Sequence, residues 1–123
     1  MSASCLMVGA AVLHLAAAAF SLEWTHSAER SGWREIWRIE GGALRLVSAA
    51  VRGSGAGMEP GDGARLAGGW WVWVPDLPPQ AALTLAASGA TQGGWTLCAD
   101  GTCRVVGAAA AAPVVVAPCP PVP

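Results

Sequence analysis

Large apolar and polar residues alternate in two runs between Phe20 and Ile39, and this alternation constrains the fold of the chain more than any other stretch. The residues that share one side are Phe20, Leu22, Trp24 and His26 in the first run, and Trp33, Glu35, Trp37 and Ile39 in the second. A period of two is typical of a β-strand, and two such runs around a segment with Ser and Gly predict a β-hairpin.

The hairpin also has a predicted register. With antiparallel strands and the large side chains on a shared face, the facing pairs are Leu22 with Ile39, Trp24 with Trp37, and His26 with Glu35. A slip by one residue would place Arg34 and Arg38 among the tryptophans and bury unpaired charges. Facing Cβ atoms lie about 4.5–5.5 Å apart, so the imidazole of His26 would contact the carboxylate of Glu35. Either Glu35 satisfies a half-buried histidine, or the two groups belong to a site.

Composition narrows the class of protein. The chain has 123 residues, of which 54% are apolar and 12% charged. That is enough for one small domain with a hydrophobic core, and it argues against extended disorder. A net charge of −1 does not supply the basic face that nucleic-acid binding needs, so no nucleic-acid partner is expected.

Short apolar runs predict strands at about residues 5–12, 18–26, 43–51, 70–74, 82–87, 95–98 and 103–106. The range 18–26 contains the first run of the hairpin. The predicted fold class is all-β, a single small antiparallel β-sandwich or partly open barrel of about seven or eight strands. The domain is expected to cover residues 1–106. Residues 107–123 are rich in Ala and Pro and are expected to form a low-complexity, disordered C-terminal tail.

Residues 3–20 are apolar and rich in Ala, so a cleaved signal peptide is one interpretation. Signal peptides begin with a positively charged region, and no Arg or Lys precedes Arg30 here. The run is also barely long enough for a membrane-spanning helix, which needs about 20 apolar residues. We therefore expect buried strands in this region and no integral membrane span.

A long Gly-rich loop is predicted over residues 52–69, with Gly55, Gly57, Met58 and Glu59 within it. Loops longer than about 12–15 residues are often functional. The segment does not fit a phosphate-binding loop, because no Lys follows the glycines and no helix is predicted to start there. Its contribution to a site would be the apolar Met58 beside the carboxylate of Glu59.

The four cysteines are Cys5, Cys98, Cys103 and Cys119. Asp100-Gly101 is a strong two-residue hairpin turn, which places Cys98 opposite Cys103 at a separation that a disulfide accepts. A zinc site would need two further ligands nearby, and the sequence offers none there. We expect a Cys98–Cys103 disulfide in an oxidising compartment, or two free thiols in the cytosol. Cys119 is expected to be incidental.

His26 and Ser27 together suggest half of a hydrolase site. Neighbours on a strand point to opposite faces, so His26 cannot activate Ser27, and a serine hydrolase is not expected. Alternatively, His26 could bind a divalent metal ion with Glu29, Glu35 or Glu59. The spacing does not require such a site, because Glu29 lies in the predicted turn and Glu59 in a distant loop.

Four segments resemble one family of small bacterial proteins. They are Phe20-x-Leu-x-Trp-x-His-Ser-x-Glu29, Trp33-x-Glu-x-Trp37, Gly53-Ser-Gly-Ala-Gly-Met-Glu-Pro60, and Leu97-Cys98 through Cys103. The family is domain of unknown function 1850, and the resemblance covers about residues 5–106. The family's usual Val between Ser27 and Glu29 is Ala28 here. The resemblance implies no established activity. Members are often encoded beside TRAP transporters that use TAXI solute-binding proteins, which is an association and not a mechanism.

These features together predict an accessory or binding module, associated with a TAXI-type TRAP solute uptake system, with no catalytic residue and no cofactor assigned. The expected partners are transporter subunits or a solute-binding protein, and the expected location is the cell envelope or periplasm. The predicted binding residues are His26, Ser27, Glu29, Glu35, Gly55, Gly57, Met58 and Glu59. The alternative is a divalent-metal- or small-ligand-binding domain that uses His26 and the nearby carboxylates.

Overall fold

The structure, a computed structural model, describes residues 4–26, 31–53, 60–85, 94–107 and 112–120, with Thr25 and His26 described by their backbone alone. These residues form eleven β-strands, which in chain order are β1 (Ser4–Val8), β2 (Ala11–Leu15), β3 (Ala19–His26), β4 (Ser31–Glu40), β5 (Ala43–Arg52), β6 (Arg65–Ala67), β7 (Trp70–Trp73), β8 (Leu83–Leu85), β9 (Trp95–Ala99), β10 (Thr102–Val106) and β11 (Val114–Pro118). In this part of the chain there is no helix that could cross a membrane.

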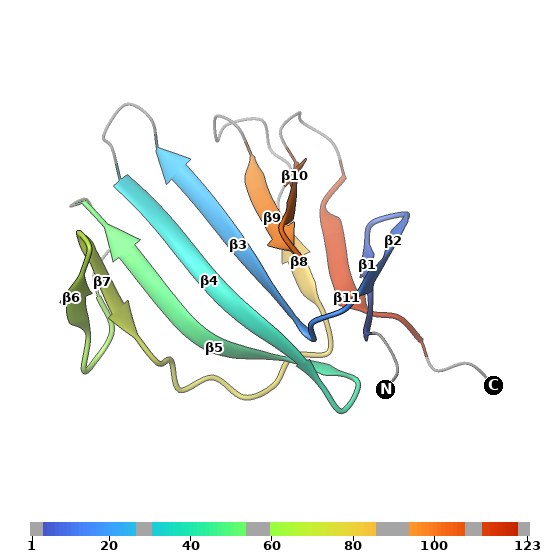
Figure 1. The fold of residues 1–123 in the computed structure, drawn as a ribbon, viewed down its shortest axis with the longest axis horizontal. Helices are drawn as coiled ribbons and strands as arrows, with labels where there is room; N and C mark the ends of the chain where they lie inside the picture. The colour runs from blue at the N-terminus through green and yellow to red at the C-terminus, as the bar shows by residue number, and fades with distance from the viewer. Residues whose placement is uncertain (1–3, 27–30, 54–59, 86–93, 108–111, 121–123) are drawn as a thin grey trace.

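The strands form two antiparallel sheets that pack as an open sandwich (Figure 1). The small sheet has the order β2-β1-β11-β8, and the large sheet has the order β10-β9-β3-β4-β5-β7-β6. Neither sheet closes on itself, so both keep two edge strands. The predicted all-β antiparallel sandwich is confirmed, with more strands than the sequence predicts and without a closed barrel.

The hydrophobic core lies between the small sheet and the part of the large sheet from β10 to β5. Its most completely buried side chains come from both sheets and include Leu6, Leu22, Leu44, Leu97 and Val116. The described strands β6 and β7 add no side chain to this cluster, and they lie at the far side of the large sheet (Figure 1). Burying a large aliphatic side chain contributes about 1.5–3 kcal/mol, so the small sheet stabilises the β9–β10 side of the large sheet more than the β6–β7 side.

The β3–β4 hairpin differs from the predicted one in register. Leu22 faces Glu35 in place of Ile39, and His26 faces Ser31 in place of Glu35, so β4 is displaced by four residues. The predicted face is retained, because four is an even number and side chains alternate with a period of two. The displacement shortens the connection to residues 27–30, and short loops close at a lower entropic cost while more residues enter the ladder. The predicted pairing of His26 with Glu35 is therefore wrong.

The alternation of side chains between the two faces is interrupted in the middle of strand β5, where Val47 has no partner on β4. Such a β-bulge adds one residue to one strand and moves every later side chain to the other face. As a result, side chains before and after the bulge are all buried on the face that carries Leu22: Leu44, Leu46, Ala49 and Val51. A strict period of two along this strand would have turned half of them away from the core.

The C-terminal segment is part of the fold and not a disordered tail over residues 112–120. Strand β11 pairs with β1 and with β8, and its central Val116 is completely buried. Cys119 is not incidental, because a disulfide joins it to Cys5 on β1. Three successive valines next to an Ala run show no alternation, so the pattern did not separate this strand from low-complexity sequence.

The hairpin turns confirm one prediction and correct two others. Asp100 and Gly101 both have positive φ, 52° and 77°, as a two-residue type I′ turn requires, and the predicted disulfide joins Cys98 to Cys103 across the ladder. A turn at Gly68-Gly69 connects β6 to β7, so the end of the predicted loop 52–69 is a hairpin. The predicted strand over residues 5–12 is likewise two strands, β1 and β2.

On the outer face of the large sheet, which is turned away from the core, Trp70 lies beneath two arginines. The guanidinium carbons of Arg34 and Arg52 lie 4.2 and 4.7 Å from the centroid of its ring, and Arg34 also pairs with Glu23 at 3.3 Å. These cations leave Trp70 only 8% exposed. The ring covers Gly32 so closely that a Cβ atom there would lie 2.8 Å from the ring carbon Cη2.

Gly32→Ala is therefore expected to lower the free energy of unfolding by about 1–3 kcal/mol, the range for overpacking a well-filled site. The sign of this change in the free energy of unfolding is informative. At an unstrained position with free space, Gly→Ala stabilises a protein, because alanine restricts the unfolded chain. Chemical denaturation would measure the loss. In a Trp70→Leu background the substitution should cost much less, and an equal cost in both backgrounds would show that the ring is not the obstacle.

Candidate functional site

The carboxylate of Glu35 lies between two indole groups on the core face of the large sheet. Trp33 donates its Nε1–H to Glu35 Oε2 over 2.8 Å, and Trp37 donates its Nε1–H to Glu35 Oε1 over 2.9 Å. Hydrogen bonds to a charged acceptor are worth about 1.5–3 kcal/mol each. We call these three residues the indole–carboxylate clamp.

The alternation of side chains along strand β4 brings the three clamp residues together. These residues are spaced by two, so all three side chains leave the same face of the sheet. On the neighbouring strands Glu35 faces Leu22 and Ala49, which are 0% and 1% exposed. These apolar neighbours limit the access of water to the half-buried carboxylate, and a lower local dielectric strengthens both hydrogen bonds. The alternation that predicts the hairpin thus also creates the clamp.

The same face continues across β7 and β6, beyond the hydrophobic core. Trp73 faces Ala49 and packs edge-to-face against Trp33, with the ring centroids 5.6 Å apart. One row further along, Trp71 faces Leu66, and these two side chains are 41% and 61% exposed. We call Trp33, Trp71, Trp73 and Leu66 the tryptophan surface.

A groove of about 420 Å³ adjoins the tryptophan surface, and its lining includes Arg65, Leu66, Trp73 and Val74. The indole of Trp73 lies against the backbone of Gly61, where any added Cβ atom would collide with the indole nitrogen. Trp73 is therefore held between Trp33 and Gly61. Val74, by contrast, is 77% exposed, so the groove combines a fixed aromatic wall with accessible aliphatic groups.

Of the predicted binding residues, Glu35 is the one whose side chain the structure describes. Its partners are two indoles and not an imidazole. His26 faces Ser31, which is four residues from Glu35 along β4, or roughly 13 Å at about 3.3 Å per residue. The other predicted residues lie outside the described residues, and their roles stay predictions: Ser27, Glu29, Gly55, Gly57, Met58 and Glu59.

One end of the large sheet borders both predicted segments of the site. The backbone of His26 faces Ser31, and Gly32 faces Arg52, so the chain enters residues 27–30 and residues 54–59 from the same end. Ser31 itself is completely buried, and its hydroxyl has no hydrogen-bond partner among the described residues. Sequence reasoning missed this serine, because Ser before Gly was interpreted as part of the turn.

The described residues contain no group of three His, Cys, Asp or Glu side chains that could hold a metal ion. The four cysteines are all used in disulfides. Glu35, the described candidate ligand, has both carboxylate oxygens engaged by the clamp.

Comparison with known proteins identifies the family. The family model described as "Domain of unknown function (DUF1850)" matches residues 20–105, a range that contains the clamp, the tryptophan surface and the Cys98–Cys103 hairpin. No curated protein and no solved structure is significantly similar to the chain. Because the match covers most of the sequence and nearly all of the large sheet, the chain belongs to the domain of unknown function 1850 family.

Proposed function

We propose that the chain is a non-catalytic binding module that docks another protein on the tryptophan surface. The observation that carries this proposal is the exposed pair Trp71 and Leu66, which face each other on the β6–β7 hairpin with 41% and 61% of their surface in solvent. Large contiguous apolar patches on a protein surface mark interaction sites, and these two side chains extend the row formed by Trp33 and Trp73. Tryptophan is also among the residues that contribute most to binding energy at protein interfaces.

The clamp supports this role by fixing the geometry of the surface. Glu35 holds the indole of Trp33, and Trp33 in turn packs against Trp73. A surface whose aromatic groups are already positioned loses less side-chain entropy on binding. The predicted contacts from His26 at the end of β3, and from Ser27, Glu29 and residues 55–59 outside the described residues, would extend the docking surface at this end of the sheet.

The proposed partner is a component of a TAXI-type TRAP solute uptake system, either a transporter subunit or the solute-binding protein. The association that the family resemblance implies supports this choice. The two disulfides support an oxidising compartment, such as the cell envelope, because thiols are kept reduced in the cytosol.

Co-purification from native membranes tests the proposal. We expect the tagged chain to recover subunits of the TRAP system, and the double substitution Leu66→Ser/Trp71→Ser to lower that recovery by about tenfold or more, as the loss of a hot spot would. Val115→Ser is the matched control, because Val115 is a 47% exposed aliphatic residue of the small sheet. Equal recovery by the double variant and the control would contradict docking on the tryptophan surface. His26→Ala in the same experiment tests the predicted extension.

A further inference from the structure

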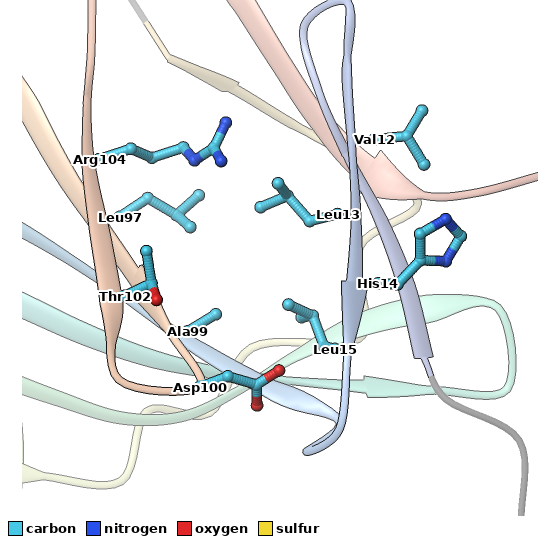
Figure 2. A pocket seen from close by; sticks show the side chains of 9 residues that line it. All are labelled: Val12, Leu13, His14, Leu15, Leu97, Ala99, Asp100, Thr102 and Arg104. Atoms are coloured by element: carbon cyan, nitrogen blue, oxygen red, sulfur yellow. The ribbon is translucent and has the colours of Figure 1, made fainter.

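A second groove lies at the other side of the large sheet, between β2 and the β9–β10 hairpin (Figure 2). Strand β2 is an edge strand of the small sheet and β10 is an edge strand of the large sheet. The sandwich is therefore open along this side. The groove has a volume of about 240 Å³ and shares no residue with the clamp or the tryptophan surface.

The walls of this groove are apolar. Leu13 on β2 and Leu97 on β9 point toward each other across it, with Leu15 and Ala99 next to them (Figure 2). Leu97 is 1% exposed, and Leu13 packs against the hydrophobic core. The walls thus belong to the stable part of the fold, and a ligand between them would contact fixed side chains.

The polar groups at the two ends of the groove differ in whether they are already paired. The carboxylate of Asp100 accepts hydrogen bonds from the backbone N–H groups of Ala16 and Ala17, at 2.7 and 3.1 Å. These bonds dock the β9–β10 hairpin against the β2–β3 connection. Arg104 extends its guanidinium group into the other end (Figure 2), and it has no carboxylate partner among the described residues.

Several arginines of the large sheet already have a partner, and Arg104 has none of these acids beside it. Glu23 pairs with Arg34, and Glu40 pairs with both Arg38 and Arg45. Arg52 lies over the ring of Trp70. An unpaired guanidinium group beside an apolar groove is complementary to an anion with an apolar chain. Its planar fork can donate two parallel hydrogen bonds to one carboxylate.

We propose that this groove binds a small carboxylate whose head pairs with Arg104 and whose apolar chain lies between Leu13 and Leu97. The hydroxyl of Thr102, two residues before Arg104 on β10, lines the same groove and supplies a further donor. The volume is below that of most drug-binding pockets, about 300–1,000 Å³, and suits a chain of roughly six to eight carbons.

Calorimetric titration of the full chain with sodium octanoate tests this site. We expect saturable binding, and we expect Arg104→Gln to weaken it by about ten- to hundredfold, the range for losing hydrogen bonds between two charged groups. Octan-1-ol should bind more weakly by a similar factor, because it lacks the anion, and acetate should bind more weakly because it lacks the chain. Arg38→Gln, which removes an exposed arginine on the outer face of β4, should leave octanoate binding unchanged.

Arg104 is exposed, so Arg104→Gln should retain the melting temperature of the parent chain, and a variant that does retain it isolates the loss of the contact. Leu13→Ser should weaken octanoate binding without removing the preference for octanoate over octan-1-ol. The proposal is overturned if octanoate does not saturate the parent chain, if Arg104→Gln binds it equally well, or if octan-1-ol binds as tightly. The experiment needs no transporter component, so its outcome is independent of the docking test.

Discussion

Replacement of both Cys5 and Cys119 by serine is expected to lower the free energy of unfolding by about 4–5 kcal/mol. The disulfide joins residues 114 positions apart in the sequence, and a cross-link that closes a longer loop removes more conformational freedom from the unfolded chain. It also fastens β1 to the residue after β11, next to a 3.1 Å backbone hydrogen bond from Cys119 N–H to the Cys5 carbonyl. For a small domain with a total stability of about 5–15 kcal/mol, such a loss is large.

The second disulfide of the chain is the internal control for this prediction. Cys98 and Cys103 are only five positions apart, so the same chain-entropy account gives about 2 kcal/mol for the Cys98→Ser/Cys103→Ser variant. Guanidinium denaturation followed by tryptophan fluorescence would compare the two double variants under identical conditions. Equal losses would show that loop length does not determine the contribution of the longer cross-link.

Glu35→Leu is expected to lower the free energy of unfolding by about 2–4 kcal/mol. The substitution leaves the Nε1–H groups of Trp33 and Trp37 without an acceptor, and each unsatisfied buried donor costs about 1–3 kcal/mol. Trp37 is 3% exposed, so water cannot replace the lost carboxylate at its indole. Relief of the cost of burying the Glu35 charge offsets part of this loss. Glu35→Gln keeps one acceptor oxygen and should cost about 1–3 kcal/mol.

Glu23→Gln is the matched control for the clamp, because Glu23 lies on the neighbouring strand and pairs with Arg34 on the outer face. This exposed salt bridge should contribute at most about 1 kcal/mol. In a double-mutant cycle, Glu35→Leu and Trp37→Phe should be strongly coupled, since each removes one member of the same hydrogen bond. Additive effects would argue against the clamp as the source of stability. Reduced partner docking by Glu35→Gln would further connect the clamp to the tryptophan surface.

Local chemistry determined the elements that sequence analysis placed correctly. The alternation around Trp24 and Trp33 predicted which face each side chain occupies, because a strand has a period of two whatever surrounds it. Asp100-Gly101 predicted a tight turn and hence the Cys98–Cys103 disulfide, because few residue pairs adopt positive φ at both positions. The sequence also singled out Glu35 as a carboxylate on an aromatic face, where it needs hydrogen-bond partners.

The alternation of apolar and polar residues did not identify the hydrogen-bond partners of Glu35. Registers that differ by four residues put the same side chains on the same face, so alternation cannot distinguish His26 opposite Glu35 from His26 opposite Ser31. The length of the ladder and the closure of a short loop decided between them. The indole donors that hold Glu35 were next to it in the sequence, at positions two residues away on either side. Their hydrogen-bonding groups could have suggested the clamp.

By itself, then, the sequence determined an all-β chain, the faces of its long strands and the turn at Asp100-Gly101, since each of these depends on neighbours a few residues apart. Only the tertiary structure decided that Val116 completes the core, that Cys5 meets Cys119, and that Arg104 lies beside Leu13. These relations join residues about a hundred positions apart. The packing of one sheet on the other creates them, and no local pattern in the chain records which distant strands will meet.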